Sequence, residues 1–473
     1  MLTNTKELFN NRKNETALFA VVQFFVFGEL LFLCLNYFQS QFFFLVALPF
    51  CFFVLNFVFN DLFYHLSLIN CIVLGFCLIK YSVSPLLLVT TGNSTVFNNS
   101  IENLKTATLL MCVELLVLYF FIFIFYRTKT EVVHIDINAD DQFNHHITLN
   151  LLLIVAVAFV FFVLLFLSES RTMFKSIFSL TEETFTWDNT YEASGNFSGS
   201  KRVVLTLFTL VFKSVRIILP LLIIYKISKL GVCTFLKLVL SITISAIQFL
   251  FITSTIAEAF IAFLILVYFI TVLYPKARKH LVLIATIFVA IIIIVLLINR
   301  SSLQRSAYYS PSVREYLSKV LSSYFPGVNS VAASLDVNPE DTLELFFSTF
   351  SYSIPFNTSL FGGGRVSYAT LFNSTSNTTG QIPSTLGMGC TFFSSFLAPV
   401  FSSLLGASSV YLNELSFGKK NIFSRALLFF ISLSLATTVG IYNSQIAFSY
   451  ILNTGLVMAI LTMAGRGRFL WKK

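Results

Sequence analysis

The chain has 473 residues, of which 56% are hydrophobic and 11% are charged, and 57 of them are phenylalanine. Its mean hydropathy is +0.83. These values lie far outside the range of soluble globular proteins, so the sequence predicts an integral membrane protein. The net charge of +9 is then explained by membrane topology, and no nucleic-acid partner is expected.

Apolar runs of roughly 18 to 23 residues, each long enough to cross a hydrocarbon core of about 30 Å, recur along the chain. About twelve of them are predicted to be transmembrane helices, so the expected fold is an all-α, polytopic membrane protein. Only Asp61 separates the second run from the third, so these two form either a hairpin or one broken element. The predicted ranges are 16–38, 42–60, 62–82, 106–126, 147–167, 203–224, 231–252, 256–274, 281–298, 386–408, 424–442 and 445–464.

The distribution of Lys and Arg predicts the orientation, because cytoplasmic loops retain positive charge. With the N-terminus inside, every inner connection except the short one at Asp61 carries a basic residue. Both termini are therefore predicted to be cytoplasmic. The first apolar run is long and lacks a small-residue cleavage site, so it is expected to remain as a helix.

This topology divides the chain into three parts. Residues 1–298 hold the first nine helices with an outer loop at 168–202, residues 299–385 form a large extracytoplasmic loop, and residues 386–473 hold the last three helices. A loop of about 85 residues is usually functional. It is expected to be helical, because SPSVREYLSKVLSSYF (310–325) predicts a helix capped by Ser310 or Ser312, and TLELFFSTF (342–350) follows the capping acids Glu340 and Asp341.

Six cations lie on or toward the predicted outer half of the membrane. Arg is suited to bidentate phosphate recognition. A flexible glycine turn just before one of the arginines would allow backbone amides to bind the phosphate as well. The pattern points to a membrane-anchored phosphate or diphosphate as ligand. The cations are Arg300, Arg305, Arg314 and Arg365 in the large loop and Lys213 and Arg216 in the sixth helix, and the glycines are Gly362, Gly363 and Gly364.

Lys213 and Arg216 interrupt the apolar stretch TLVFKSVRIILP (209–220). They are three residues apart, so they share one helix face, and Pro220 is expected to bend or open the helix one turn later. A purely structural alternative is that they pair with buried acids and hold the bundle together. The candidate acids are Glu29, Glu114 and Glu258. Both interpretations can hold together, because a cavity for a lipid diphosphate needs counter-charges when it is empty.

The remaining polar residues limit the chemistry. All five histidines are predicted to be cytoplasmic, so a general base on the outer face would come from a carboxylate such as Glu258 or from a tyrosine. Glu315 could pair with the neighbouring Arg314 or take part in catalysis. All seven cysteines fall within predicted helices, which argues against disulfides and a CxxC metal site, and no metal or other cofactor is expected. The tyrosines considered for the substrate site are Tyr308, Tyr309 and Tyr324.

This layout resembles the Wzy-type oligosaccharide repeat-unit polymerases of bacterial capsule, exopolysaccharide and O-antigen assembly. The resemblance covers the arrangement of about twelve spans with one large, arginine-bearing outer loop before the last three. At sequence level it rests on YFPGVNSVAASL (324–335) and on NTTGQIPSTLGMGCTFFSSFLAPVFSSLLGASSVYLNE (377–414), which is similar to a segment that re-enters the membrane.

The resemblance implies a metal-independent glycosyltransferase of the GT-C-like class in the bacterial cytoplasmic membrane. It would transfer a growing glycan from undecaprenyl diphosphate to the end of a new lipid-linked repeat unit on the outer face. Its implied partners are that lipid-linked oligosaccharide, membrane lipid, a flippase and a chain-length regulator. The loop arginines would contact diphosphate and sugar, and the cations of the sixth helix would lie at the carrier site.

Three alternatives remain. A ligase of the O-antigen type has a similar layout but resembles a pattern with an outer-loop histidine, which this chain lacks. A lipid-linked oligosaccharide flippase is expected to show two similar halves with short loops, and the long loop breaks that symmetry. A generic transporter is less favoured, because the predicted helices contain few polar groups.

Overall fold

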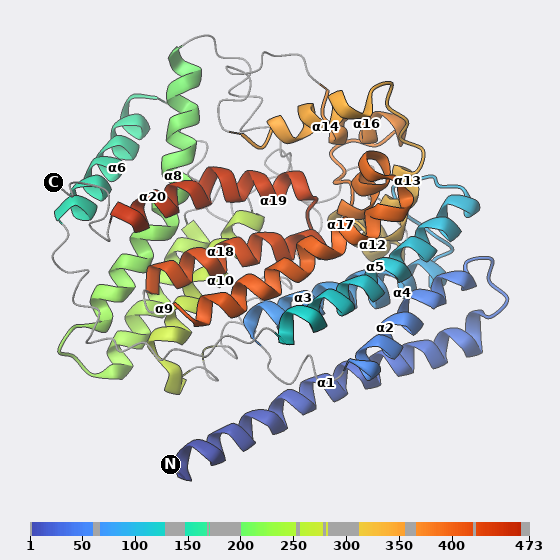
Figure 1. Cartoon of the computed structure of the whole chain (residues 1–473), viewed down its shortest axis with the longest axis horizontal. Coiled ribbons are helices and arrows are strands. Elements are labelled where there is room, and N and C mark those ends of the chain that lie inside the picture. Colours follow the sequence, from blue (N-terminus) through green and yellow to red (C-terminus); the bar gives the residue numbers. More distant parts are fainter. Residues whose placement is uncertain are drawn as a thin grey trace.

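The computed structural model describes residues 2–59, 67–127, 147–167, 170, 200–251, 256–277, 281, 312–354, 366–419 and 422–464. Every regular element in this part of the chain is helical (Figure 1), so the all-α prediction is confirmed there. The helices are α1 (Leu2–Tyr37), α2 (Ala47–Val58), α3 (Leu68–Leu78), α4 (Ser84–Thr90), α5 (Ile101–Arg127), α6 (Ile147–Phe166), α8 (Ser200–Ser228), α9 (Thr234–Phe251), α10 (Ile256–Leu273), α12 (Val313–Tyr324), α13 (Val328–Ser334), α14 (Thr342–Ser351), α16 (Tyr368–Thr375), α17 (Thr385–Phe417), α18 (Ile422–Ala436), α19 (Ser444–Tyr450) and α20 (Leu456–Ala464).

Five shorter helical turns complete the described part. Two of them are π-helical, and they join α3 to α4 and α19 to α20 without a break. The π-helical turns are η3 (Ile79–Val83) and η12 (Ile451–Gly455), and the 3-10 turns are η1 (Phe43–Val46), η8 (Pro275–Ala277) and η11 (Thr437–Val439). Because π-helical turns are rare and often occur at functional sites, η3 and η12 are two candidate positions for a functional site.

Several helices are long and apolar enough to cross a membrane, which supports a membrane protein. Within the described residues, five segments meet this criterion: Phe19–Tyr37, Leu68–Thr90, Ile101–Phe125, Val203–Ser228 and Thr385–Phe417. Shorter apolar helices occupy the other predicted ranges that the structure describes: Phe43–Val58, Leu153–Phe166, Thr234–Leu250, Phe260–Leu273, Phe423–Val439 and Ser444–Ile460. The helical character of these ranges is confirmed. Almost all of the ninth predicted range, 281–298, lies outside the described residues.

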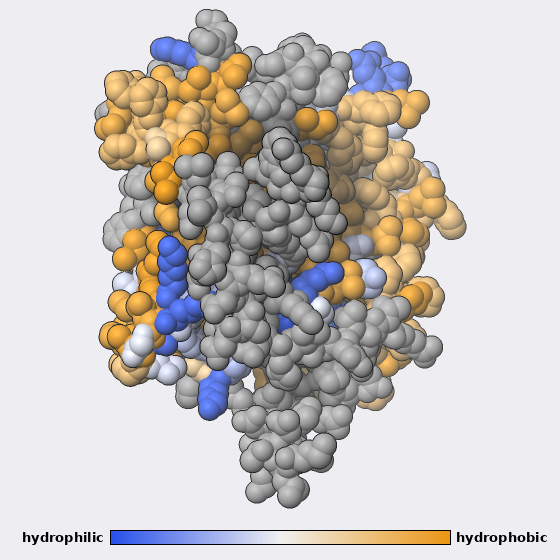
Figure 2. Space-filling view, turned by 60° about the vertical axis from the view of Figure 1, so that its left-hand side comes forward, coloured by the Kyte–Doolittle hydropathy of each residue, from blue (hydrophilic) through white to orange (hydrophobic). Residues whose placement is uncertain are grey.

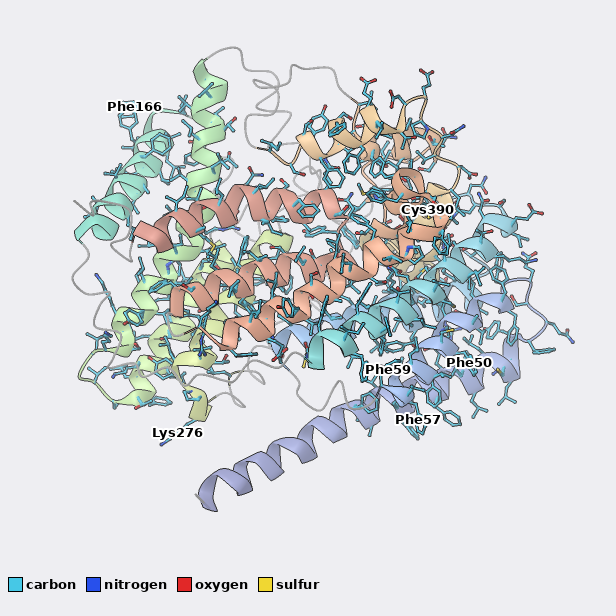
Figure 3. The ribbon with its side chains drawn as sticks, in the orientation of Figure 1. Phe50, Phe57, Phe59, Phe166, Lys276 and Cys390 are labelled. Carbon is cyan, nitrogen blue, oxygen red and sulfur yellow. The ribbon has the colours of Figure 1, made fainter. Side chains whose placement is uncertain are left out.

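Large apolar side chains cover the outside of the bundle. Phe50 and Phe57 of α2 are 57% and 74% exposed, and Phe166 at the end of α6 is 70% exposed. Figure 3 shows these three rings on the periphery of the molecule. In the face drawn in Figure 2, hydrophobic residues cover most of the described surface and hydrophilic ones form small groups. Such a surface suits a hydrocarbon environment.

Helix α17 is the centre of the bundle. It packs along α5 on one side and α18 on the other, and the three helices cross the middle of Figure 1. Helices α1 to α4 lie on the α5 side, whereas α6, α8, α9 and α10 lie beyond α18. Small residues allow the close approach: a Cβ on Gly406 of α17 would lie 2.9 Å from Val439 Cγ2 and 3.0 Å from Leu118 Cδ1.

One end of the bundle gathers helix ends that the alternating topology predicts on the same side. The ring of Phe125, near the end of α5, lies 5.2 Å from that of Tyr411 in α17. Tyr225 of α8 lies 5.8 Å from Phe423 at the start of α18, and the Tyr268 hydroxyl of α10 is 3.2 Å from the Ser416 hydroxyl. The relative directions of α5, α8, α10, α17 and α18 are therefore as the topology requires.

The opposite end carries a helical cap, defined here as the described residues of 312–384 with helices α12, α13, α14 and α16 (Figure 1). Two predicted caps are confirmed. The Ser312 hydroxyl accepts a hydrogen bond from the Glu315 amide (3.2 Å), and Asp341 accepts bonds from the amides of Leu343 (2.8 Å) and Glu344 (3.0 Å). Glu340 lies outside α14 and Ser310 lies outside the described residues. The expected helical character of the large loop is confirmed in this part.

Tyr368 lies in a small hydrophobic core beneath the cap helices. Its burial predicts that the stability of the cap depends on pH. Burial raises the pKa of Tyr368 from 10.0 to about 12. The folded-state pKa lies above the unfolded value. The neutral, buried phenol of Tyr368 therefore contributes its full stability below pH 10, and this stability is lost as the pH rises through 12. We expect a loss of about 1.4 kcal/mol at pH 11. The core contains Phe97, Ala333, Val337, Leu345, Tyr368, Phe372 and Met388.

The measurement is protease resistance of the cap at pH 9 and pH 11 in the wild type and in Tyr368→Phe. The phenylalanine variant keeps a ring that cannot ionise, so its cap should lose less resistance over this interval than the wild-type cap. Equal losses in both proteins would contradict the assignment of this pH dependence to Tyr368.

Candidate functional site

The structure describes only part of the predicted site. Arg314, Tyr324, Lys213 and Arg216 are described with their side chains, and Glu258 is described as a helical residue of α10 only. The other candidates, Arg300, Arg305, Tyr308, Tyr309, Gly362, Gly363, Gly364 and Arg365, lie outside the described residues.

Helix α12 carries two of these candidates at opposite ends. Arg314 is exposed in its first turn and Tyr324 is its last residue, 38% exposed. Ten residues of helix separate them by about 15 Å along the axis, so they do not form one local contact site. Arg314 and Glu315 form no ion pair in the described part of the chain. Adjacent helical residues point in different directions, so the first of the two alternatives for Glu315, a pair with Arg314, is not formed.

Helix α8 buries the second group of candidates. Arg216 is 6% exposed and Lys213 is half-buried. Ser214, which lies between them in the sequence, donates its hydroxyl to the Leu210 carbonyl (3.0 Å) and approaches the Thr454 carbonyl of η12 (3.4 Å). The turn of α8 with the two cations therefore packs against a π-helical turn. Buried cations in a membrane helix are functional candidates.

Pro220 does not open α8 after these cations, and whether it bends the helix stays a prediction. The helix runs continuously from Ser200 to Ser228 through Pro220. The neighbouring segment η12 carries the irregular backbone instead: residues Ile451–Gly455 are π-helical within a longer helical run. An irregular backbone at membrane depth is tolerated where protein surrounds it, and α8, α18 and α20 all contact η12.

The proposed pairing of Lys213 and Arg216 with Glu114 or Glu29 is wrong. Glu114 Oε2 instead accepts a salt bridge from Lys80 Nζ at 2.8 Å, with both side chains almost fully buried. Glu29 of α1 accepts a hydrogen bond from the Ser82 hydroxyl. The sequence does not identify Lys80 as a buried partner, because it lies near the end of the helix predicted over 62–82, where a lysine can reach water. In the structure that helical run continues to Thr90, so Lys80 lies inside it.

Both carboxylate oxygens of Glu114 accept hydrogen bonds. Besides Lys80, its Oε2 accepts a bond from the Tyr81 hydroxyl (2.5 Å). Its Oε1 accepts one from Ser402 (2.5 Å), and its backbone carbonyl accepts one from Ser403 (2.7 Å). This network, named here the Glu114 network, ties η3 and α5 to α17. Such complete satisfaction is what a buried carboxylate requires in a medium of low dielectric constant.

The two sequence stretches that carry the family resemblance meet in space. Helix α13 lies in 324–335 and is buried along its whole length. Its Ser330 hydroxyl accepts a hydrogen bond from the Ser384 amide (3.0 Å) at the start of α17. Asn99, just before α5, donates to the Asn329 carbonyl (2.9 Å). These hydrogen bonds link α13 to the residues that precede α5 and α17.

Helix α17 is sharply kinked just inside this junction. Ser394 has φ 77° and ψ 157°, a backbone conformation that is adopted almost only by glycine. A Cβ on Gly389 would lie 3.0 Å from both Cα and Cβ of Ala398, whereas nine residues of straight helix span about 13.5 Å. The first leg therefore folds back on the second. The predicted span 386–408 is helical but is not one straight helix.

The described residues thus combine a cap with exposed polar groups, a kinked helix beneath it and buried cations in α8. Among them, no group of three or more His, Cys, Asp or Glu side chains lies close enough to hold a metal ion. All seven cysteines are free thiols. Comparison with protein-family models, with curated proteins and with solved structures finds no match to this chain.

Proposed function

We propose that this chain is a membrane glycosyltransferase that polymerises lipid-linked oligosaccharide repeat units. It transfers a growing glycan from undecaprenyl diphosphate to a hydroxyl group at the end of a new lipid-linked unit. The observation that carries the proposal is the contact between α13 and the first leg of α17, because these are the two stretches that resemble the Wzy-type polymerases. Their packing at the cap supports treating them as parts of one site.

The proposed reaction needs positive charge more than it needs a cofactor. The acceptor hydroxyl oxygen forms a bond to the anomeric carbon, the bond from that carbon to the diphosphate oxygen breaks, and the hydroxyl proton passes to a base. Charge builds up on the departing diphosphate, so fixed cations that meet it lower the barrier. Arg300, Arg305, Arg314 and Arg365 are the proposed diphosphate and sugar contacts, with Lys213 and Arg216 at the carrier.

The proposal includes a location and topology. The chain would cross the bacterial cytoplasmic membrane about twelve times, with both termini in the cytoplasm, the cap outside and an arrangement of the GT-C class. The common end of α5, α8, α10, α17 and α18 supports the alternating directions of the helices. Which side of the membrane the cap occupies can be measured by labelling exposed cap residues in intact cells.

The test uses purified protein in nanodiscs with a synthetic undecaprenyl-diphosphate-linked repeat unit. We expect a gel ladder of lengthening glycans for the wild type, and loss of the ladder for Arg216→Gln. The matched control is Lys226→Gln, which removes an exposed cation from the same helix and should leave the ladder unchanged. Absence of a ladder together with passage of the substrate across proteoliposome membranes would replace the proposal with a flippase.

A further inference from the structure

Helix α14 of the cap has its polarity reversed with respect to a helix on a water-soluble surface. Its buried side carries the hydroxyl groups of Ser348, Thr349 and Ser351 beside one leucine, and its exposed side carries large apolar groups. Ser348 donates to the Val366 carbonyl (2.5 Å), and Thr349 accepts a bond from the Tyr368 amide (2.9 Å). Leu343 and Phe347, one turn apart on the other side, are 70% and 66% exposed. Helices in water bury the apolar stripe instead.

Aromatic contacts beside the stripe of Leu343 and Phe347 hold this orientation of α14. The ring of Phe346 packs 5.3 Å from Phe392 and 5.9 Å from Phe393 in the first leg of α17. Phe350 lies 5.8 Å from Phe448 of α19. Phe346 and Phe350 also pack on each other, 4.8 Å apart, along one side of the stripe. The helix therefore cannot rotate to bury the stripe without breaking these contacts. The outward apolar face is thus part of the packed structure.

Helix α14 packs against α17, which is long and apolar enough to cross a membrane. Just past the kink in α17, Phe396 is 84% exposed, Leu397 49% and Val400 36%. Phe393, which contacts α14, also packs 4.9 Å from Phe401 in the second leg. In Figure 1, α14 lies beside α19 and above the start of α17. Phe393 therefore links α14 to the second leg of α17, on which these exposed apolar residues lie.

The charges of α14 lie at one end only. Glu340, Asp341 and Glu344 are exposed at its N-terminus, and no charged residue follows between 345 and 354. A helix in the headgroup region of a bilayer has this combination of an apolar face and a polar border. Ile354, 37% exposed, extends the apolar side beyond the last turn.

We propose that α14 is embedded in one leaflet of the bilayer, with Leu343 and Phe347 among the acyl chains and its acidic N-terminus at the headgroups. The occupant of the stripe is membrane lipid. The inference is independent of the proposed enzymatic activity, since it concerns only where the cap lies. It makes the cap a partly membrane-inserted element, whereas the sequence predicted an extracytoplasmic loop.

The experiment reads single tryptophans in proteoliposomes. The two native tryptophans, Trp187 and Trp471, are first changed to phenylalanine, and Phe347→Trp then reports on the stripe. Leu343→Trp is a second reporter, in case the first variant does not fold. Phe396→Trp serves as the reference for lipid contact and Glu340→Trp as the reference for water.

We expect brominated phosphatidylcholine to quench Phe347→Trp and Leu343→Trp roughly two-fold or more, close to the reference in α17, and iodide to have little effect. Glu340→Trp should respond to iodide. Strong iodide quenching of the stripe reporters would place the stripe in water and overturn the proposal. Resistance to both quenchers would overturn it as well, because it would show that protein covers the stripe.

Discussion

Glu114→Gln is expected to lower the free energy of unfolding by about 3–5 kcal/mol, because it leaves the buried ammonium of Lys80 without a counter-charge. The ammonium lies 2.8 Å from Glu114 Oε2 and is 2% exposed, so water cannot replace the carboxylate. The same substitution weakens the hydrogen bonds from Tyr81 and Ser402 to the carboxylate. Thermal unfolding of the purified protein in detergent measures the effect.

A double-mutant cycle separates the ion pair from its surroundings. Lys80→Met alone should be as harmful as Glu114→Gln, since it leaves the carboxylate unpaired, whereas the double variant should lose less than the sum of the two. Glu102→Gln and Lys105→Met provide the control, because both residues are exposed in the first turns of the same helix α5. Single variants as stable as these controls would refute the role given to the Glu114 network.

Gly387→Ala is expected to loosen the cap and to lower the free energy of unfolding by about 1–3 kcal/mol. An added Cβ would overlap the Ser334 hydroxyl, and it would lie 2.5 Å from Ser334 Cβ and 2.8 Å from Ser384 Oγ. These atoms belong to the buried helix α13 and to the helix cap of α17, so they cannot move away freely. The change therefore separates the two stretches that support the proposed function.

Hydrogen exchange of α13 and α16, compared with that of α18, measures the loosening locally. The compensating variant Gly387→Ala/Ser334→Gly removes the clashing side chain and should recover much of the protection. Gly75→Ala is the matched control, since an added Cβ there meets no atom within 4 Å and alanine favours a helix. Unchanged exchange in Gly387→Ala would show that the junction tolerates more separation than its geometry indicates.

The proposed function rests on the cation pattern of the sequence and on two features of the described structure. The cation pattern predicted a diphosphate site, but most of its loop members lie outside the described residues. What the described part contributes is a buried Arg216 beside the π-helical turn η12 and a junction between the two resembling stretches. The glycan ladder tests the proposed activity and the role of Arg216, whereas the tryptophan experiment tests only the position of α14.

The amino-acid sequence by itself determined the features that depend on local free energies. Apolar runs long enough to span hydrocarbon became helices, and Ser312 and Asp341 capped α12 and α14 as predicted, because a cap forms within one turn of chain. Membrane character and the helical cap were readable for the same reason.

Only the tertiary structure decided which distant groups meet. Lys80 and Glu114 are 34 residues apart, and nothing local distinguishes this partner from Arg216. The fold-back at Ser394 depends on the close contact of Gly389 with Ala398. The outward apolar face of α14 depends on the hydrogen bonds of the Ser348 and Thr349 hydroxyls with the Val366 carbonyl and the Tyr368 amide. In each case the deciding free energy comes from desolvation and packing between separate elements, which a linear pattern does not contain.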